Sequence, residues 1–141
     1  MRRFVVIAGP TATGKTRVAV EVAKRLGSEV ISADSMQIYR GLNIGTAKTA
    51  PEEMQGVLHH LIDIVSPDEP YTVADFQRDA FSIIDGLNQK GVTPVVAGGT
   101  GLYINSLVYD LDFSGVKGDE AFRQKLTQLA GDNGLEILYN Q

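Results

Sequence analysis

Residues 9–16 read Gly-Pro-Thr-Ala-Thr-Gly-Lys-Thr, and this segment constrains the fold more than any other part of the chain. Glycines in such a loop let backbone amides approach a polyanion, and a helix that follows points its N-terminus at the same charge. The preceding run, Phe4 to Ala8, is almost wholly apolar, as is typical of a strand buried on both faces. This order predicts a phosphate-binding P-loop made of Gly9, Pro10, Thr11, Ala12, Thr13, Gly14, Lys15 and Thr16.

Short apolar runs alternate with helical patterns along most of the chain. The apolar runs predict strands at 4–8, 29–32, 61–65 and 92–97. The helical patterns predict helices at 15–26, from Thr72 to about Lys90, and at 102–109, with two further helical pieces at 119–130 and 135–141. Thr72 and Asp75 have the spacing of a capping box. We therefore expect one α/β domain over residues 1–141, a P-loop-type doubly wound parallel sheet flanked by helices.

Composition narrows the class of protein. A chain of 141 residues with 43% hydrophobic and 21% charged residues suits one globular domain. No apolar run is long enough to cross a bilayer, and the P-loop starts too near Met1 to leave room for a signal peptide, so we expect a cytoplasmic protein without membrane contact. The absence of cysteine excludes disulfides and thiolate chemistry. A net charge of −4 does not indicate a nucleic-acid binder, although the 13 Lys and Arg residues leave room for a local basic patch.

The P-loop also predicts a metal ion. Lys15 is placed to contact terminal phosphate oxygens, and the Thr16 hydroxyl is placed to join the ligand shell of Mg²⁺. A P-loop alone suggests a nucleoside triphosphate. In many nucleotide hydrolases a later strand ends in an aspartate, whereas the run Pro94 to Ala97 is followed by glycines and a threonine, which argues against a standard ATPase.

Asp34 is the carboxylate predicted to face the phosphate site, because it follows the second strand. It suits a general base that accepts a proton from an incoming nucleophile. Aspartate is also favoured as a turn former or helix N-cap, so this structural role stays open as the alternative to the catalytic one. Thr100, in a second glycine-rich turn at residues 98–101, is predicted to add a hydroxyl at the same edge of the sheet.

Other polar residues carry weaker indications. His59 and His60 are adjacent, so on a strand they point to opposite faces and cannot chelate one metal together, which favours structural roles. A long polar stretch from Gln37 to Pro51 is typical of a functional loop. Its Tyr39, Arg40 and Lys48 are candidates for partner contacts, and solvated loop residues are the simpler interpretation.

Six blocks, taken in order, make the pattern specific. They are 9–16, 31–40 (ISADSMQIYR), 43–48 (NIGTAK), 59–63 (HHLID), 71–76 (YTVADF) and 98–103 (GGTGLY). On these blocks the chain resembles the tRNA dimethylallyltransferases, the tRNA isopentenyltransferase family, over nearly its whole length. That resemblance implies transfer of a dimethylallyl group from dimethylallyl diphosphate to the exocyclic amine of the adenosine 3′ of the anticodon in tRNA, with release of pyrophosphate.

The resemblance also implies roles for matching residues. The P-loop would hold the diphosphate, with Lys15 neutralising the leaving group and Thr16 helping to hold Mg²⁺. Asp34 would accept the amine proton, and Thr100 would line the reaction channel as a second catalytic residue. The tRNA contacts implied are Asp34, Ser35, Met36, Gln37, Thr100 and Arg123. The partners implied are dimethylallyl diphosphate and the tRNA anticodon stem-loop.

Family members are much longer than this chain, and the resemblance implies that they add a helical tRNA-binding insertion and a C-terminal part. We therefore expect a fragment of the catalytic domain, taken from an enzyme that acts as a monomer. An adenylate isopentenyltransferase, which modifies a free nucleotide, is the nearest alternative. A small-molecule P-loop kinase and a non-catalytic nucleotide-binding module are the others. An Arg-rich lid is not recognisable in the sequence, which argues against the kinase.

Overall fold

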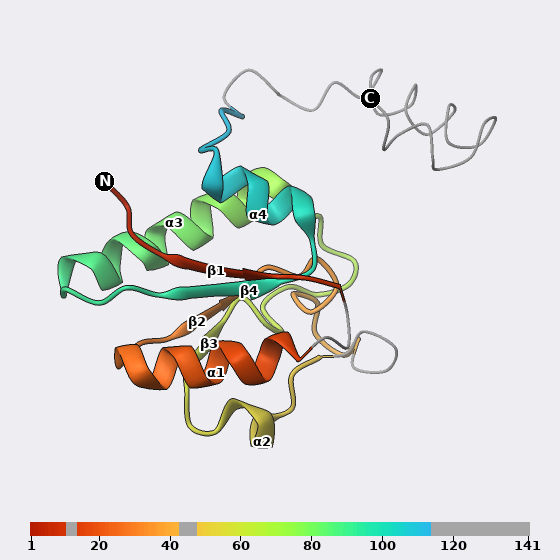
Figure 1. Ribbon diagram of the computed structural model, residues 1–141. Helices are drawn as coiled ribbons and strands as arrows, with labels where there is room; N and C mark the ends of the chain where they lie inside the picture. Colours follow the sequence, from red (N-terminus) through yellow and green to blue (C-terminus); the bar gives the residue numbers. More distant parts are fainter. Residues whose placement is uncertain (11–13, 43–47, 114–141) are drawn as a thin grey trace. The chain divides into compact units, whose positions relative to one another are not determined.

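The computed structural model describes residues 1–10, 14–42 and 48–113, and these residues contain a four-stranded, wholly parallel sheet (Figure 1). Its strands are β1 (Val5–Ala8), β2 (Val30–Ser32), β3 (His59–His60) and β4 (Val95–Gly98), in the order β1-β4-β2-β3. β4 pairs with β1 on one side and with β2 on the other, with Val96 opposite both Val6 and Ile31. The predicted parallel sheet is confirmed.

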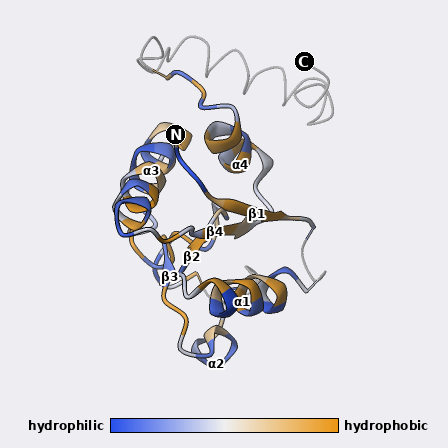
Figure 2. Ribbon diagram, turned by 60° about the vertical axis from the view of Figure 1, so that its left-hand side comes forward, coloured by the Kyte–Doolittle hydropathy of each residue, from blue (hydrophilic) through white to orange (hydrophobic). Residues whose placement is uncertain are grey.

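Helices cover both faces of this sheet (Figure 1). α1 (Lys15–Leu26) and the short α2 (Pro51–Met54) lie on one face, and α3 (Val73–Gln89) and α4 (Gly101–Val108) lie on the other. Two apolar clusters follow from this arrangement, because alternate strand residues point to opposite faces. Val30 and Val95 pack with Ala19 and Ala23 of α1. Val6, Ile31 and Val96, which point to the opposite face, pack with side chains of α3 and α4, namely Phe76, Ile84, Tyr103 and Leu107. Figure 2 shows the apolar strands between α1 and α3, two helices that carry both hydrophilic and hydrophobic residues.

The ends of α1 and α3 follow the sequence signals. α1 ends at Gly27, which adopts a left-handed conformation (φ 59°) that glycine tolerates without strain. At the start of α3 the Thr72 hydroxyl accepts from the Asp75 N–H, and the Asp75 carboxylate accepts from the Thr72 N–H. The predicted capping box is therefore confirmed.

The third strand is not where the apolar run predicted it. β3 is His59–His60 and pairs with Val30 and Ile31 of β2, whereas 61–65 was the predicted strand. Leu61 and Asp63 adopt left-handed backbone conformations (φ 64° and 56°), which no strand can continue through. Val65 makes only an isolated bridge to Tyr39. The run is apolar because Leu61 and Val65 are buried in a turn.

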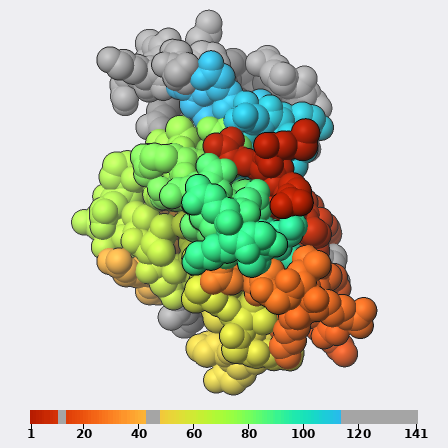
Figure 3. Space-filling view, turned by 90° about the vertical axis from the view of Figure 1, so that its left-hand side faces the viewer, coloured from red at the N-terminus to blue at the C-terminus, as the bar shows by residue number. Residues whose placement is uncertain are grey.

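The N-terminal residues pack on α3. The Arg2 guanidinium lies over the Phe81 ring, 3.8 Å from its centroid, and pairs with Asp85 at 2.9 Å. Asn88 bonds the backbone N–H and C=O of Arg3. Figure 3 shows these N-terminal residues, in red, lying against the green surface that includes α3. These contacts fix the start of β1, and with it the approach of the chain to the P-loop.

The chain divides into two units, Met1–Leu111 and Asp112–Gln141, and the elements above belong to the first. The helical pieces predicted at 119–130 and 135–141 lie outside the described residues. Within residues 1–10, 14–42 and 48–113, no helix is long and apolar enough to cross a membrane.

Candidate functional site

The described part of the P-loop has the geometry of an anion site. Gly14 is the N-cap of α1 and has φ 83°, a conformation that favours glycine. The first backbone bond of the helix runs from the Val18 N–H to the Gly14 C=O, so the N–H groups of Lys15, Thr16 and Arg17 precede the helical ladder. Such unpaired amides, with the helix dipole behind them, favour a bound phosphate.

The Lys15 side chain bonds to the backbone of the P-loop. Its Nζ donates a 2.8 Å hydrogen bond to the Pro10 C=O. A bond of this kind holds the ammonium group near the loop, where a phosphate oxygen would be a stronger acceptor than a carbonyl. The Lys15 ammonium group thus lies at the loop, and its role toward a diphosphate stays a prediction.

The second glycine-rich turn lies directly beside the P-loop. A Cβ on Gly99 would lie 3.3 Å from the Gly9 carbonyl oxygen and 3.8 Å from Lys15 Nζ. A Cβ on Gly98 would lie 2.2 Å from the Ala33 carbonyl oxygen, a distance that no side chain tolerates. Glycine at 98 thus lets β4 pack closely against the end of β2. The loops after β1, β2 and β4 consequently meet at one edge of the sheet, as predicted.

Asp34 forms the turn that follows β2. Its Oδ1 accepts from the Met36 N–H at 2.9 Å and from the Gln37 N–H at 3.3 Å. The turn-forming role left open by the sequence is confirmed. Among the described residues its second carboxylate oxygen, Oδ2, has no hydrogen-bond partner, so one oxygen shapes the loop while the other is available to a proton donor.

Thr100 ties α4 to this turn. Its hydroxyl oxygen accepts a 3.0 Å hydrogen bond from the Ser35 N–H and lies 3.4 Å from the Ser35 hydroxyl. The Thr100 N–H in turn donates to the Ala33 C=O. The structure therefore brings Thr100 to the turn after β2, as predicted, and places it where it holds the backbone beside Asp34.

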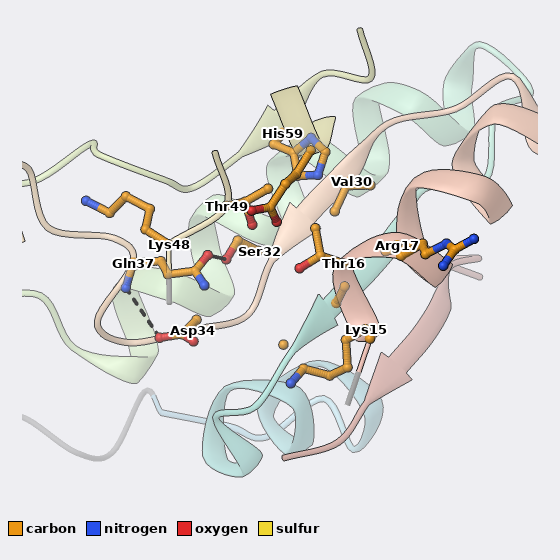
Figure 4. Close-up of a pocket in the computed structure, with 15 residues that line it drawn as sticks. Lys15, Thr16, Arg17, Val30, Ser32, Asp34, Gln37, Lys48, Thr49 and His59 are labelled. Atoms are coloured by element: carbon orange, nitrogen blue, oxygen red, sulfur yellow. Dashed lines mark hydrogen bonds between the residues drawn. The ribbon is translucent and has the colours of Figure 1, made fainter. Parts of the chain in front are cut away.

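A cavity of about 380 Å³ connects the P-loop with the Asp34 turn. Figure 4 shows Lys15 and Thr16 on one side of this cavity and Asp34, Gln37 and Lys48 on the other, while Arg17 points away from them. Its lining residues are Gly14, Lys15, Thr16, Arg17, Ala19, Val30, Ser32, Asp34, Gln37, Lys48, Thr49, Glu53, His59, Ala97 and Gly98. The candidate phosphate-binding residues Lys15 and Thr16 and the Asp34 carboxylate thus line one cavity.

A stacked aromatic pair lies near the Asp34 turn. Tyr103 of α4 stacks on Phe76 of α3 with ring centroids 4.1 Å apart. Burial raises the pKa of the Tyr103 phenol to about 12, with smaller contributions from Tyr39 and from the negative charge of Asp34. Tyr103 therefore remains a neutral phenol throughout the physiological range.

His59 and His60 point in different directions, as predicted. His60 Nε2 lies 3.5 Å from Glu29 Oε2, whereas the His59 ring lines the cavity (Figure 4). His59 Nδ1 lies 2.8 Å from the Val57 carbonyl oxygen, and this contact requires the nitrogen to be the protonated one. Burial lowers the pKa of His59, partly offset by that hydrogen bond. At neutral pH His59 is therefore an uncharged imidazole in the cavity wall, a position that no sequence pattern predicted.

The donor set of the cavity fits the predicted Mg²⁺. Thr16 offers a hydroxyl at the cavity, and Mg²⁺ prefers such oxygen ligands together with phosphate and water. Within the part of the chain that the structure describes, no three His, Asp or Glu side chains gather into a metal site.

Several predicted residues fall outside this description. Thr11, Ala12, Thr13 and Arg123 lie outside the described residues, so their predicted roles remain predictions. Ser35 is beside Thr100, and Met36 is exposed. Three buried or half-buried polar residues of the cavity wall, Ser32, Thr49 and His59, were not predicted, because they come from separate segments with no shared motif.

Two family models match the chain. The one described as IPP transferase matches residues 37–141, and the one described as isopentenyl transferase matches residues 2–66. Together they span both the P-loop and the Asp34 turn. The family resemblance of the six sequence blocks is thereby confirmed.

Curated relatives agree with these models. The tRNA dimethylallyltransferase of Acetivibrio thermocellus is 54% identical over 141 residues, which is 100% of this chain and 45% of the relative. That of Geobacillus thermodenitrificans is 52% identical over 139 residues, covering 99% of this chain and 44% of the relative. The chain thus spans less than half the length of the curated relatives it matches.

Solved structures carry the same fold. The full-length tRNA isopentenylpyrophosphate transferase of Bacillus halodurans superposes with a TM-score of 0.79 at 46% identity, covering 99% of this chain and 46% of that one. A eukaryotic dimethylallyltransferase acting on tRNA gives a TM-score of 0.74 at 28% identity, covering 99% and 35%. These tRNA isopentenyltransferases share the P-loop-type parallel sheet found here. The chain belongs to the IPP transferase family.

Proposed function

We propose that the protein transfers a dimethylallyl group from dimethylallyl diphosphate to the exocyclic amine of the adenosine 3′ of the anticodon in tRNA. The observation that carries the proposal is the single cavity that joins the P-loop to Asp34. Relatives named tRNA dimethylallyltransferase support it across the length of this chain. Because the acceptor is tRNA, we place the reaction in the cytoplasm.

The P-loop holds the diphosphate in this proposal. Amides at the start of α1 and the Lys15 ammonium face the leaving group, whose negative charge grows as the carbon–oxygen bond breaks. Mg²⁺ beside Thr16 would supply further positive charge to the same oxygens. A site already formed before the reaction stabilises that charge with little reorganisation.

Asp34 accepts the proton. The amine lone pair forms a bond to the allylic carbon, the bond from that carbon to the diphosphate oxygen breaks, and its electron pair leaves with pyrophosphate. The amine then loses a proton to Asp34 Oδ2, the oxygen that the turn does not use. No covalent enzyme intermediate is needed. Atoms and charge balance with prenylated adenosine, pyrophosphate and a protonated Asp34 as the products.

The acceptor adenine must leave the anticodon stack to reach the allylic carbon. The turn at Asp34, Ser35, Met36 and Gln37 lies at the cavity and supplies backbone and side-chain groups that suit the edge of an extruded base. Thr100 holds this turn through Ser35. In this proposal the turn contacts the target nucleotide, and Thr100 lines the channel between the two substrates.

The test uses the natural protein at its full length, incubated with unmodified tRNA, dimethylallyl diphosphate and Mg²⁺. Mass spectrometry of the digested tRNA is expected to show one prenylated adenosine next to the anticodon. Preferential modification of free adenylate would instead make the protein an adenylate isopentenyltransferase. Phosphate transfer from ATP to a small acceptor, without prenylation, would make it a kinase and overturn the proposal.

A further inference from the structure

Lys48 is a nearly buried lysine at the wall of the cavity. Its side chain is only 7% exposed. The Nζ donates a 2.9 Å hydrogen bond to the Tyr39 C=O and forms an ion pair with the Asp63 carboxylate. One ammonium group therefore joins the loop after β2 to the turn after β3. The sequence singled out Lys48 only as a possible partner contact, and the structure turns its charge inward.

Backbone hydrogen bonds run along the same junction. The Asp63 N–H donates to the Gln37 C=O at 3.0 Å, and the Ile64 N–H donates to the Ile38 C=O at 2.9 Å. The Arg40 N–H donates to the Val65 C=O at 2.8 Å, while Arg40 Nε donates to the Asp63 C=O. The segment 37–40 is thus laid against the turn 61–65, although neither forms a regular strand there.

The turn at 61–65 adopts a backbone conformation that costs free energy. Leu61 and Asp63 both lie in the left-handed region, which costs about 1 kcal/mol or more for each residue that is not glycine. Contacts outside the turn must offset this cost. The ion pair from Lys48 to Asp63 and the backbone bonds to Gln37 and Ile38 are the contacts that do so.

We propose that Lys48 and Asp63 are positioning residues that fix the acceptor turn, Asp34 to Gln37, at a set distance from the P-loop. The proposal rests on the proposed prenyl transfer and deepens it. Thr100 holds the turn at Ser35, and the Lys48–Asp63 pair holds the segment that follows it, so the turn is fixed at both ends. Neither Lys48 nor Asp63 takes part in the chemistry. They act by fixing the position of Asp34 and of the adenine that Asp34 contacts.

The expected effect is on turnover rather than on donor binding. In-line transfer needs the acceptor amine within near-attack distance of the allylic carbon, and a displacement of about 1 Å can cost about 100-fold in rate. In the full-length protein, Lys48→Met should lower kcat about 10- to 100-fold and raise KM for tRNA. Binding of inorganic pyrophosphate with Mg²⁺, measured by calorimetry, should change less than about twofold. Lys48→Arg, which keeps the charge, should recover part of kcat.

A double-mutant cycle tests the pairing. If Lys48 acts through Asp63, the double variant Lys48→Met/Asp63→Asn should be no slower than Lys48→Met alone. Lys90→Met, which removes an exposed lysine at the end of α3, is the matched control and should leave all parameters unchanged. Additive losses in the double variant would contradict the pairing, and unchanged turnover in Lys48→Met would contradict the role.

Hydrogen exchange gives a readout that does not depend on turnover. In Lys48→Met the amides of Arg40, Asp63 and Ile64 should exchange faster, while those of β1 and β4 remain protected. If all amides exchanged faster, those of β1 and β4 included, and pyrophosphate bound more weakly, Lys48 would contribute only to overall stability. That result would overturn the proposal. If the wild-type protein prenylates no substrate, the proposed function is wrong. Hydrogen exchange would still show whether the Lys48–Asp63 ion pair holds the turn.

Discussion

The Ser35 N–H donates a 3.0 Å hydrogen bond to the Thr100 hydroxyl across 65 residues of sequence. This contact joins the glycine-rich turn after β4 to the turn after β2. The carboxyl edge of the sheet is therefore one connected assembly of loops.

Replacement of Thr100 by valine should remove the hydrogen bond between these two loops. Valine has a similar shape but leaves the Ser35 N–H without its acceptor, which costs about 1–3 kcal/mol if the group stays buried. We expect Thr100→Val to slow prenyl transfer at least 10-fold, whereas Thr100→Ser, which keeps the hydroxyl, stays within about threefold. Steady-state kinetics of the two variants decides this. Equal rates in the two variants would contradict a role for the hydrogen bond from Ser35.

Lys15 should dominate binding of the leaving group. Charge-assisted hydrogen bonds contribute about 1.5–3 kcal/mol, so Lys15→Met should weaken binding of inorganic pyrophosphate by about 10- to 100-fold. Lys24 of the same helix is exposed and bonds only Gln55 Oε1 in the described structure, so Lys24→Met is the control. Calorimetric titration in the presence of Mg²⁺ measures both. Similar affinities for the two variants would remove Lys15 from the phosphate site.

Two glycines should respond to alanine in opposite directions. A Cβ at Gly98 would overlap the Ala33 carbonyl, so Gly98→Ala should lower the free energy of unfolding by about 1–3 kcal/mol or more. Gly86 lies inside α3 with nothing within 4 Å of a new Cβ, so Gly86→Ala should raise that free energy by up to about 1 kcal/mol. Urea denaturation of both variants tests the packing. A Gly98→Ala protein as stable as wild type would contradict the close approach of β4 to β2.

The capping box should make stability depend on acidity. Hydrogen bonds from Thr72 hold the pKa of Asp75 below its ordinary value of 3.8, with Arg78 contributing less. Because the folded pKa is depressed, the stabilisation is fully present above the unfolded pKa and is lost as the pH falls through the folded one. Asp75→Ala removes the carboxylate that accepts from the Thr72 N–H and should cost about 1 kcal/mol near neutral pH. Its penalty should shrink below about pH 4, measured as unfolding free energy against pH, and a constant penalty would contradict the linkage.

The sequence predicted the elements that carry strong local signals. The P-loop, α1 and the capping box of α3 were predicted because glycine spacing, helical periodicity and a Thr-to-Asp pair each have local physical causes. α2 was missed because four residues from Pro51 to Met54 are too few to show a period. β3 was misplaced because two histidines form the strand, while the apolar run beside them is buried in a turn.

The site was predictable where one motif held several of its residues. The cavity is lined by Gly14, Lys15 and Thr16 of the P-loop and by Asp34 and Gly98, as their positions at the carboxyl ends of β1, β2 and β4 implied. Thr49 and His59 also line it, and no motif pointed to them there. The inward turn of Lys48 depends on contacts with Tyr39 and Asp63, which are 9 and 15 residues away, and no local pattern encodes such a contact.

The most direct measurement compares full-length wild type with Asp34→Asn under single-turnover conditions, following prenylated adenosine in tRNA and binding of inorganic pyrophosphate in parallel. Asparagine keeps an oxygen that can accept from the Met36 and Gln37 N–H groups, so the turn should survive while the base is lost. We predict a rate about 100- to 10,000-fold lower, with pyrophosphate affinity unchanged within about twofold. An Asp34→Asn enzyme that prenylates tRNA at the wild-type rate would contradict the assignment of Asp34 as the base.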